Sequence, residues 1–342
     1  MSGRKKWAIV AAFAATALVG AACADDEGNQ VTDGGQPGLT GTIVISGSST
    51  VEPVSALVAE LFNETNPDVG ISVDGPGTGD GFELFCNGET DISDASRPID
   101  QEEVDACTQN GIQFVELEVA FDGIAVMTNP ENASVACLNS GDLYALVGPE
   151  SEGFGTWSDA NALARKVGGT GNFPSTPLDI TAPGEESGTY DAFIELSGIP
   201  DIGIERGLSE TDAEALRKDY QASPNDNVII QAIEGSPSSV GFVGFAFAQE
   251  AGEGVRVLDI DGGDGCVAPS AESIADGSYP LSRSLYIYVN QAKIAESPAL
   301  KAYVDYYLSD DGLTAAVSEV GYIPLPADRV EASRAAWETA AA

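Results

Sequence analysis

Short apolar runs alternate with helix-like segments between residues 41 and 111. β-Branched residues are concentrated in "GTIVISG" (41–47), "VGISVDG" (69–75) and "TDISDAS" (90–96), which have the composition of buried strands. A helical segment follows each run: one from about Thr50, then "FELFCNG" and then "QEEVDACTQNG". This alternation predicts an α/β sheet with its loops at the carboxyl ends of the strands.

Two of these helix starts have the spacing of a capping box, in which a short polar residue is followed three positions later by Glu. Asp100 and Glu103 have this spacing, and so have Ser49 and Glu52. The sequence therefore predicts side-chain caps at both helices.

Two longer strand-like runs divide the remaining chain. "IQFVELEVAFDGIAVMTNP" (112–130) exceeds a strand of average length, so we expect two strands with a crossing between domains near residues 119–122. "YPLSRSLYIYVN" (279–290) is interpreted as the return crossing. Helices are expected near 139–147, 188–198 and 225–235, and again over "PALKAYVDYYLS", "DGLTAAVSEVG" and the polar tail.

The two crossings predict an α/β fold of two lobes. Residues 41–120 and 267–342 are expected to form lobe 1, and residues 121–266 to form lobe 2. Two lobes joined by two crossings make a hinge, and the ligand of such a protein sits in the cleft between the lobes.

Composition narrows the possible functions by exclusion. The 342 residues include 15 Lys and Arg against 54 Asp and Glu, a formal net charge of -39. Nucleic acid is excluded as a partner because binding its backbone needs a basic face, and we interpret the acidity as a source of solubility. The chain has no histidine. This removes Ser-His-Asp and Cys-His catalysis and the commonest zinc ligand, so we expect neither an enzyme nor a metal or other cofactor.

The N-terminal residues have the features of an export signal. Three basic residues precede the apolar run 7–22, which is shorter than the roughly 20 residues that a membrane span needs. We therefore expect residues 1–22 to be a signal peptide.

Cys23 follows small residues and resembles the lipidated cysteine of bacterial lipoproteins. Gly20 stands where those signals usually have leucine, and a plain cleaved signal peptide is the alternative. Residues 23–40 are polar, Gly-rich and without periodicity, which is typical of a flexible tether. The expected location is the outer face of the cell membrane, with Cys23 as the lipid anchor.

Four further cysteines, Cys86, Cys107, Cys137 and Cys266, predict two disulfides in an exported protein, with three possible connectivities. Cys86 ends one expected helix and Cys107 lies in the next, so a local Cys86–Cys107 pair is favoured. That choice leaves Cys137 with Cys266. Zinc is the competing interpretation, but no C-x-x-C spacing supports it.

Three segments share one local chemistry at points where a strand ends and a helix begins. "SGSST" (46–50), "GPGTGDGF" (75–82) and "EESGTYDAF" (185–193) each offer backbone N–H groups, hydroxyls and the positive end of a helix dipole. Ordinary helix capping is the alternative for any one of them, and "GPGTGDG" lacks the full spacing of a dinucleotide loop. Because all three are expected to face the cleft, together they predict an oxyanion site.

At these residues the chain resembles the PstS-type receptors, the phosphate-binding proteins of the high-affinity phosphate ABC importers. The resemblance spans nearly all of residues 41–325 and rests on "SGSSTV", "GPGTGDGFELFCNGETDISDASRPI", "SGTYDAF", "VGFVGFAF" and "YPLSRSLYIYV". It implies a two-lobed periplasmic-binding-protein-like fold of type II, with the ligand in the interlobe cleft. It also implies that the protein captures inorganic phosphate and hands it to a membrane permease.

The resemblance further implies which residues hold phosphate. The family's S-T pair at the first helix start corresponds to Ser49 and Thr50, with the Val51 amide. The hydroxyl of its glycine loop corresponds to Thr78. Its S-G-T motif in the second lobe corresponds to Ser187, Gly188 and Thr189.

The sequence departs from the family at two of its polar positions. Arg97 stands where many members have an aspartate that accepts the ligand's proton, and Pro183 stands where many have an arginine. Arg97 is thus expected to supply the cation. Glu185 is the candidate acceptor, repelling sulfate while accepting a hydrogen bond from protonated phosphate. The alternatives are an ion pair for Arg97 and a solvated turn for Glu185. For Arg283 a hinge-stabilising pair is favoured.

Two other functions stay open at this stage. A receptor for another oxyanion, sulfate or molybdate, would use the same hydroxyls and amides. A phosphatase with a Ser or Thr nucleophile would lack both histidine and a convincing carboxylate cluster for a metal.

Overall fold

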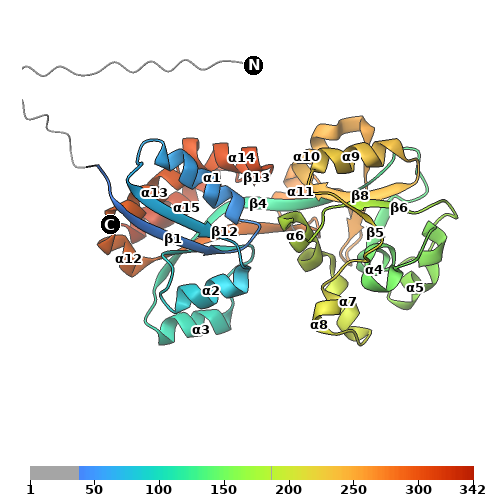
Figure 1. The fold of residues 1–342 in the computed structure, drawn as a ribbon, viewed down its shortest axis with the longest axis horizontal. Coiled ribbons are helices and arrows are strands. Elements are labelled where there is room, and N and C mark those ends of the chain that lie inside the picture. The colour runs from blue at the N-terminus through green and yellow to red at the C-terminus, as the bar shows by residue number, and fades with distance from the viewer. Residues whose placement is uncertain (1–37, 186) are drawn as a thin grey trace, which may run out of the picture. The chain divides into compact units, whose positions relative to one another are not determined.

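One long strand, β4 (Phe114–Thr128), joins the two halves of the fold in the computed structural model, which describes residues 38–185 and 187–342 (Figure 1). Residues 114–123 of β4 pair with β12 (Ser282–Asn290), and residues 124–128 pair with β8 (Ser239–Gly244). The predicted division into two strands is therefore wrong. The pairing partner changes at the crossing while the strand itself continues.

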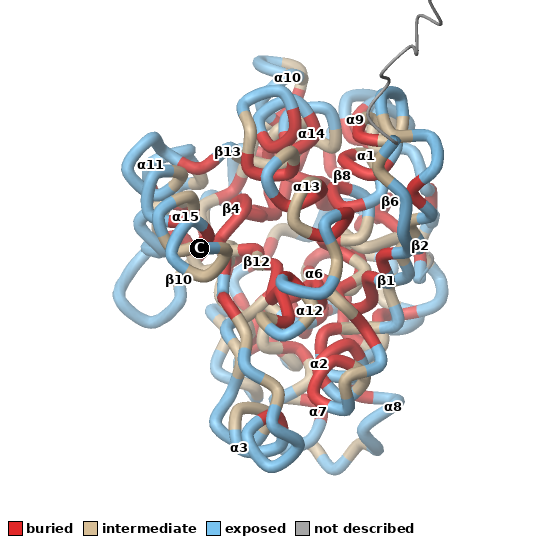
Figure 2. Tube along the Cα trace, turned by 90° about the vertical axis from the view of Figure 1, so that its left-hand side faces the viewer, coloured by how far each residue is buried: buried red, intermediate tan, exposed pale blue. Residues whose placement is uncertain are grey.

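The residue pattern of β4 explains this continuity. Val115 and Leu117 pack into the core of lobe 1, whereas Ile124 and Met127 pack into the core of lobe 2. Residues 114–119 of β4 alternate apolar residues with Glu116 and Glu118, whereas residues 119–128 are buried throughout and form a nearly continuous apolar run. In Figure 2 the trace of β4 and β12 is largely buried, whereas outer segments such as α3 are exposed.

Lobe 1 contains the strands and helices that come before the crossing and those that follow the return. They are β1 (Gly41–Gly47), α1 (Glu52–Asn63), β2 (Val69–Asp74), α2 (Thr78–Cys86), β3 (Ile92–Ala95), α3 (Gln101–Gln109), α12 (Gln291–Glu296), α13 (Pro298–Tyr307), a π-helical turn (Asp310–Thr314), α14 (Ala315–Val320), β13 (Ile323–Pro324) and α15 (Ala327–Ala340). The expected strands at the start of this lobe are confirmed. So is the capping box at α3, where the Asp100 side chain accepts from the Glu103 N–H and the Glu103 side chain from the Asp100 N–H.

Lobe 2 contains the elements between the crossings. They are β5 (Cys137–Asn139), α4 (Ser140–Val147), α5 (Asn161–Lys166), β6 (Asp179–Ala182), α6 (Gly188–Ser197), α7 (Ile199–Glu205), α8 (Glu210–Ala213), β7 (Gln221–Ala222), α9 (Asp226–Gly235), α10 (Phe245–Ala251), β9 (Arg256–Val257), β10 (Asp259–Asp261), β11 (Cys266–Val267) and α11 (Ala271–Ala275). The three helices expected in this lobe correspond to α4, α6 and α9. The short helices α5, α7, α8, α10 and α11 were not predicted.

The main sheet has the order β2-β1-β3-β12-β4-β8-β6-β7 and crosses from one lobe to the other at β4. β2 and β3 lie parallel to β1, and β6 lies parallel to β8. This confirms the two-lobed α/β fold. It also directs the carboxyl ends of β1 and β3, and that of β6, toward the region between the lobes.

The packing of the cores fits a return crossing within residues 279–290, as interpreted from the sequence, rather than a lobe boundary at residue 267. Ile274, Tyr279 and Leu281 belong to the core of lobe 2, whereas Leu285 belongs to the core of lobe 1. We therefore propose that lobe 1 resumes at about Ser282, where β12 begins.

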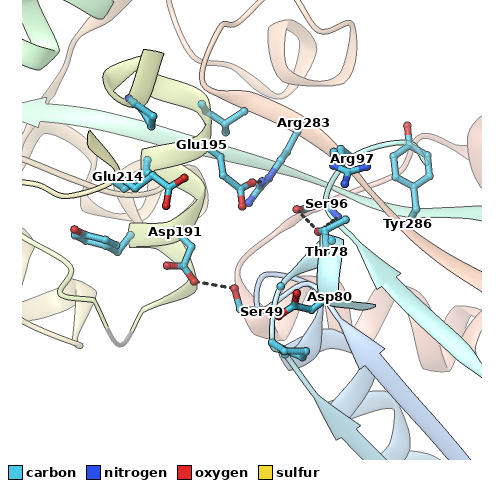
Figure 3. Close-up of a pocket in the computed structure, with 18 of the residues that line it drawn as sticks. Ser49, Thr78, Asp80, Ser96, Arg97, Asp191, Glu195, Glu214, Arg283 and Tyr286 are labelled. Carbon is cyan, nitrogen blue, oxygen red and sulfur yellow. Dashed lines mark hydrogen bonds and ion pairs between the residues drawn. The ribbon is translucent and has the colours of Figure 1, made fainter. Parts of the chain in front are cut away.

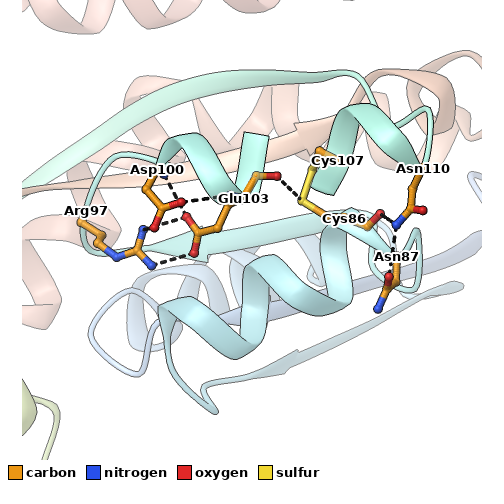
Figure 4. Close-up of a disulfide and its surroundings, with 7 residues drawn as sticks. All are labelled: Cys86, Asn87, Arg97, Asp100, Glu103, Cys107 and Asn110. Carbon is orange, nitrogen blue, oxygen red and sulfur yellow. Dashed lines mark hydrogen bonds and ion pairs between the residues drawn. A yellow bond between two sulfur atoms is a disulfide. The ribbon is translucent and has the colours of Figure 1, made fainter. Parts of the chain in front are cut away.

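Both favoured disulfides are present. Cys86–Cys107 ties α2 to α3 across 21 residues (Figure 4). Cys137–Cys266 closes a loop of 129 residues and connects β5 to β11, the two strands that flank β10 in a small separate sheet. The expected signal peptide (1–22), Cys23 and the tether up to residue 37 lie outside the described residues. Within the described ranges, no helix is long and apolar enough to cross a membrane.

Candidate functional site

A pocket lies between the lobes and takes its lining from five segments. They are Ser49, residues 75–80, residues 96–98, the face of α6 with its neighbours Pro200 and Glu214, and residues 283, 284 and 286 at the start of β12 (Figure 3). The first three are the loops at the carboxyl ends of β1, β2 and β3. In α/β sheets, ligands bind at this edge.

Glycines allow the three predicted segments to approach one another closely. A β-carbon on Gly75 would lie 2.8 Å from the Cα of Ser49, and one on Gly188 would lie 3.2 Å from the carbonyl oxygen of Ser49. The turn containing Ser49 is thus enclosed by the glycine loop of its own lobe and by the start of α6 from the other lobe. The predicted convergence of the three segments is therefore present in the structure.

The turn before α1 differs from the prediction of a capping box. The N-cap of α1 is Val51, which makes no side-chain cap, so the predicted pairing of Ser49 with Glu52 is wrong. The carbonyl of Ser48 instead accepts from the N–H groups of Val51 and Glu52, at 3.1 and 2.9 Å. The Val51 amide is consequently already hydrogen-bonded, whereas the hydroxyl of Ser49 reaches across to α6 and donates to Asp191.

Thr50 is buried and is oriented from two sides. Its Oγ1 accepts a hydrogen bond from Nη2 of Arg283 at 2.8 Å, and its carbonyl accepts from the Tyr322 hydroxyl at 2.8 Å. Because the Thr50 oxygen accepts from Arg283, its own hydrogen can be donated to an anion.

Thr78 and Ser96 form a second pair of hydroxyls in the pocket. Thr78 Oγ1 accepts from the Ser96 N–H at 3.2 Å and lies 3.0 Å from Ser96 Oγ. Both residues are buried, and Thr78 is the first residue of α2. Two hydroxyls beside a helix N-terminus form a polar, donor-rich wall of the pocket.

Ser187, Gly188 and Thr189 begin α6. Ser187 is its N-cap, and the Ser187 Oγ accepts from the Thr189 N–H at 3.2 Å. This is the ordinary capping role weighed in the sequence analysis, and it still leaves the hydrogen of the Ser187 hydroxyl to donate. All three residues are half-buried, and Gly188 is in contact with the Ser49 turn, while the lining of the pocket on α6 begins one residue later, at Tyr190.

Arg283 lines the pocket at the start of β12 and forms the hinge-stabilising pair that the sequence analysis favours for it. Its side chain is 9% exposed, and it contacts Thr50 in lobe 1, Glu195 on α6, and Asp122 on β4 at 3.5 Å. Asp122 is its partner in the β12–β4 register, so the fold itself places the two side chains opposite one another. Burial raises the pKa of the Asp122 carboxyl, and the nearby guanidinium of Arg283 opposes that shift.

Arg97 lines the pocket, but its guanidinium is held elsewhere. It makes two hydrogen bonds to Glu103, at 2.8 and 2.7 Å, and lies 5.5 Å from the centre of the Phe82 ring (Figure 4). Glu103 also caps α3, so Arg97 is part of the support of that helix. The ion-pair alternative therefore describes Arg97 better than the expected role in anion binding.

Glu185 does not line the pocket and is exposed. It belongs to the turn that precedes α6. The structure thus gives Glu185 the solvated position considered as its alternative.

Sequence reasoning missed two carboxylates of α6 that face the cleft. Asp191 accepts a hydrogen bond from Ser49 Oγ at 2.9 Å, and Glu195 forms an ion pair with Arg283. Their spacing was a usable signal, because Ser187, Asp191 and Glu195 succeed one another at intervals of four and share one helix face. Ser96, which follows β3 directly, was also missed.

Asp94 is a fully buried carboxyl next to this site, at the end of β3. Its Oδ1 accepts from Ser55 at 2.9 Å, and its Oδ2 has no hydrogen-bond partner among the described residues. Burial raises the pKa of Asp94 to about 8, with smaller contributions from the charges of Glu52 and Asp74. The folded protein therefore holds a proton that the unfolded chain releases above about pH 4.

This proton makes a testable contribution to stability. A raised carboxyl pKa stabilises the fold at low pH, and the stabilisation is lost as the pH rises toward 8. Between pH 5 and pH 7, we expect the wild type to lose about 2 kcal/mol more free energy of unfolding than Asp94→Asn. Urea unfolding of both proteins across this range measures the difference. Parallel pH dependences would contradict the prediction.

Comparison with known proteins agrees with this fold. Residues 32–311 match the family model described as a PBP superfamily domain. The chain is 38% identical over 286 residues to Protein SphX of Synechocystis, covering 83% of this chain and 79% of the relative. It is 30% identical over 325 residues to the Phosphate-binding protein PstS of Staphylococcus saprophyticus, covering 94% and 91%.

A solved structure extends the comparison to three dimensions. The crystal structure of a possible phosphate binding protein from Planctomyces limnophilus superposes with a TM-score of 0.78 at 32% identity, covering 88% of this chain and 99% of that one. Fold and pocket together define a two-lobed substrate-binding protein. The chain belongs to the PBP superfamily and, within it, to the PstS-type family of phosphate-binding proteins.

Proposed function

We propose that the protein is an extracytoplasmic receptor that captures inorganic phosphate between its lobes and delivers it to the membrane permease of an ABC importer. The observation that carries this proposal is the meeting of hydroxyl-bearing helix starts from both lobes at the Ser49 turn, at the edge of a pocket that Arg283 also lines. The names of its PstS relatives and of the Planctomyces structure support phosphate as the ligand.

The proposed site uses donors from both lobes. Lobe 1 supplies the hydroxyls of Ser49, Thr50 and Thr78. Lobe 2 supplies Ser187, Gly188 and Thr189 at the start of α6, and Arg283 supplies the positive charge from the hinge. Such donors bind an oxyanion by hydrogen bonds and by the helix dipole. Val51, Arg97 and Glu185 are left out because of the contacts described above.

Binding alone is the proposed activity, without a chemical step. Phosphate held by donors of both lobes stabilises the closed arrangement, because only that arrangement satisfies all of its oxygens. The closed, loaded receptor is the form that the permease recognises in this proposal.

Anchoring to the outer face of the cell membrane through Cys23 completes the proposal. Residues 1–22 would be removed as a signal peptide, and residues 23–40 would tether the lobes to the lipid. Partitioning of the exported protein into the detergent phase tests the anchor, and recovery in the aqueous phase would favour a plain cleaved signal instead.

Calorimetric titration of the purified protein tests the function directly. The protein is first freed of bound anion by unfolding and refolding, and is then titrated with phosphate and, separately, with sulfate at constant ionic strength. Saturable phosphate binding with one site and little response to sulfate is expected. Equal binding of both would indicate a general oxyanion receptor, and binding of neither would overturn the proposal.

A further inference from the structure

The carbonyl of Thr50 is hydrogen-bonded by a residue from the far end of the chain. Tyr322, which follows α14, donates its hydroxyl to this carbonyl at 2.8 Å, across 272 positions of sequence. The residues three and four positions after Thr50 do not supply this bond, because Pro53 has no N–H group and the N–H of Val54 donates to Val51. The bond from Tyr322 is therefore a tertiary contact that α1 itself does not replace.

This contact fixes the backbone beside the proposed phosphate donors. The peptide unit after Thr50 is held at both of its polar groups, since its carbonyl accepts from Tyr322 and its N–H donates to the Ser48 carbonyl at 3.1 Å. Because a peptide unit is planar, holding both groups sets its orientation and constrains the backbone from which the Thr50 side chain projects. Tyr322 therefore acts on the same residue whose hydroxyl Arg283 orients.

Residues 321–325, which contain Tyr322, rest on lobe 2. Gly321 ends α14 in the left-handed conformation, with φ +88°, and a β-carbon on it would lie 2.8 Å from the ring of Phe247 on α10. Glycine thus lets this ring pack directly against the backbone. Leu325 is buried in the core of lobe 2, and β13 pairs with β4 at the crossing (Figure 1). A segment that follows the helices of lobe 1 is therefore in contact with the body of lobe 2.

We propose that Tyr322 is a positioning residue of the anion site, which sets the turn of Ser49 and Thr50 according to the position of lobe 2. When lobe 2 moves about the hinge, residues 321–325 move with it, and Tyr322 carries that displacement to the Thr50 carbonyl. The donors of lobe 1 thus reach their binding geometry in the arrangement that also brings α6 to them. The inference rests on the proposed function and deepens it, because it gives a residue outside the pocket lining control over phosphate affinity.

The first test is the phosphate affinity of Tyr322→Phe, measured by calorimetric titration beside the wild type. The substitution removes one hydroxyl and keeps the ring, so the packing of residues 321–325 on lobe 2 is retained. We expect the affinity to fall about 10-fold, because the turn loses the bond that holds the Thr50 carbonyl. An unchanged affinity would overturn the inference.

Tyr303→Phe is the matched control. The Tyr303 hydroxyl donates to the carbonyl of Ser55 at 3.0 Å, so it also bonds a backbone carbonyl of this part of the chain, but further along α1 and from within the core of lobe 1. We expect both variants to lose a similar amount of stability in urea unfolding, while Tyr303→Phe keeps the phosphate affinity of the wild type within about twofold. An equal loss of affinity in Tyr303→Phe would make Tyr322 an ordinary support of α1 and would contradict the proposed role.

Phe247→Ala tests the part played by lobe 2. Phe247 lies outside the pocket lining, and its loss removes the contact of α10 with Gly321. We expect phosphate affinity to fall about threefold. Because the ring acts through Tyr322 in this proposal, the double variant Phe247→Ala with Tyr322→Phe is expected to bind phosphate no more weakly than Tyr322→Phe alone. An unchanged affinity in Phe247→Ala, or effects that multiply in the double variant, would refute the coupling.

The outcomes also separate this inference from the function on which it rests. A wild type that binds phosphate with an affinity insensitive to Tyr322→Phe refutes the inference alone. A wild type that binds no phosphate refutes the proposed function as well. Thermal unfolding of each ligand-free variant shows whether a loss of phosphate binding reflects a loss of fold.

Discussion

Replacing Arg283 by glutamine is expected to weaken phosphate binding by about 100-fold and to lower the free energy of unfolding by about 3 kcal/mol. Phosphate affinity and the free energy of unfolding are lowered for different reasons. Binding suffers because the site loses its buried positive charge and the group that orients the Thr50 hydroxyl. Stability suffers because Asp122, whose side chain is 4% exposed, keeps its buried carboxyl without a cation beside it.

A second substitution separates these causes. In Arg283→Gln with Asp122→Asn, the uncompensated carboxyl is gone, so we expect most of the lost stability to return. Phosphate affinity is expected to stay low, because nothing in this double variant restores the charge in the cleft. Urea unfolding and calorimetric titration measure the two effects independently.

Arg97→Gln is the control for the loss of a cleft-lining arginine. Arg97 is committed to Glu103, so its loss is expected to change phosphate affinity by no more than about threefold and to cost about 1 kcal/mol or less of stability. If Arg97→Gln weakened binding as much as Arg283→Gln, the assignment of the binding cation to Arg283 would be wrong.

Removing the Cys137–Cys266 disulfide, by replacing both cysteines with serine, is expected to cost about 5 kcal/mol of stability. The bond closes a loop of 129 residues that contains most of lobe 2, and a long closed loop restricts the unfolded chain more than a short one. The corresponding change at Cys86–Cys107, which closes 21 residues, is expected to cost about 3 kcal/mol.

Urea unfolding of the two double-serine variants beside the oxidised wild type measures both losses. Which of the two variants loses more stability is the informative result, because the chain-entropy explanation distinguishes the two disulfides only by the length of the loop that each closes. A larger loss for the short Cys86–Cys107 loop would contradict the chain-entropy explanation and would point to residual structure in the unfolded lobe 2.

A strand or helix could be predicted from the sequence wherever its own residues carried a clear local pattern. Strands such as β1 and β2, and the helix α3 with its capping box, follow from β-branched runs and from the spacing of Asp100 and Glu103. Short helices such as α8, with only four residues, carry too little periodicity to be recognised. β4 was misread because a strand buried in two cores has the length of two ordinary strands.

The hydroxyl-bearing part of the candidate site was predictable for the same reason. The hydroxyls of Ser49, Thr50 and Thr78 and the S-G-T motif stand at junctions of strand and helix that the local pattern marks. The cation is a prediction that our proposal moves from Arg97 to Arg283. Arg97 and Arg283 are equally visible in the sequence, and only their contacts tell them apart.

By itself, the sequence determined the α/β class, the two lobes, the favoured disulfides and the three hydroxyl-bearing segments of the cleft. These depend on local propensity, on periodicity and on the order of elements along the chain. The tertiary structure alone decided which charges face the pocket between the lobes. Ser49 meets Asp191 across 142 positions of sequence, and Arg283 meets Thr50 across 233. Such pairings depend on strand register and on how the lobes pack. The effect of a charged side chain depends on the groups around it, and only the fold determines which groups those are.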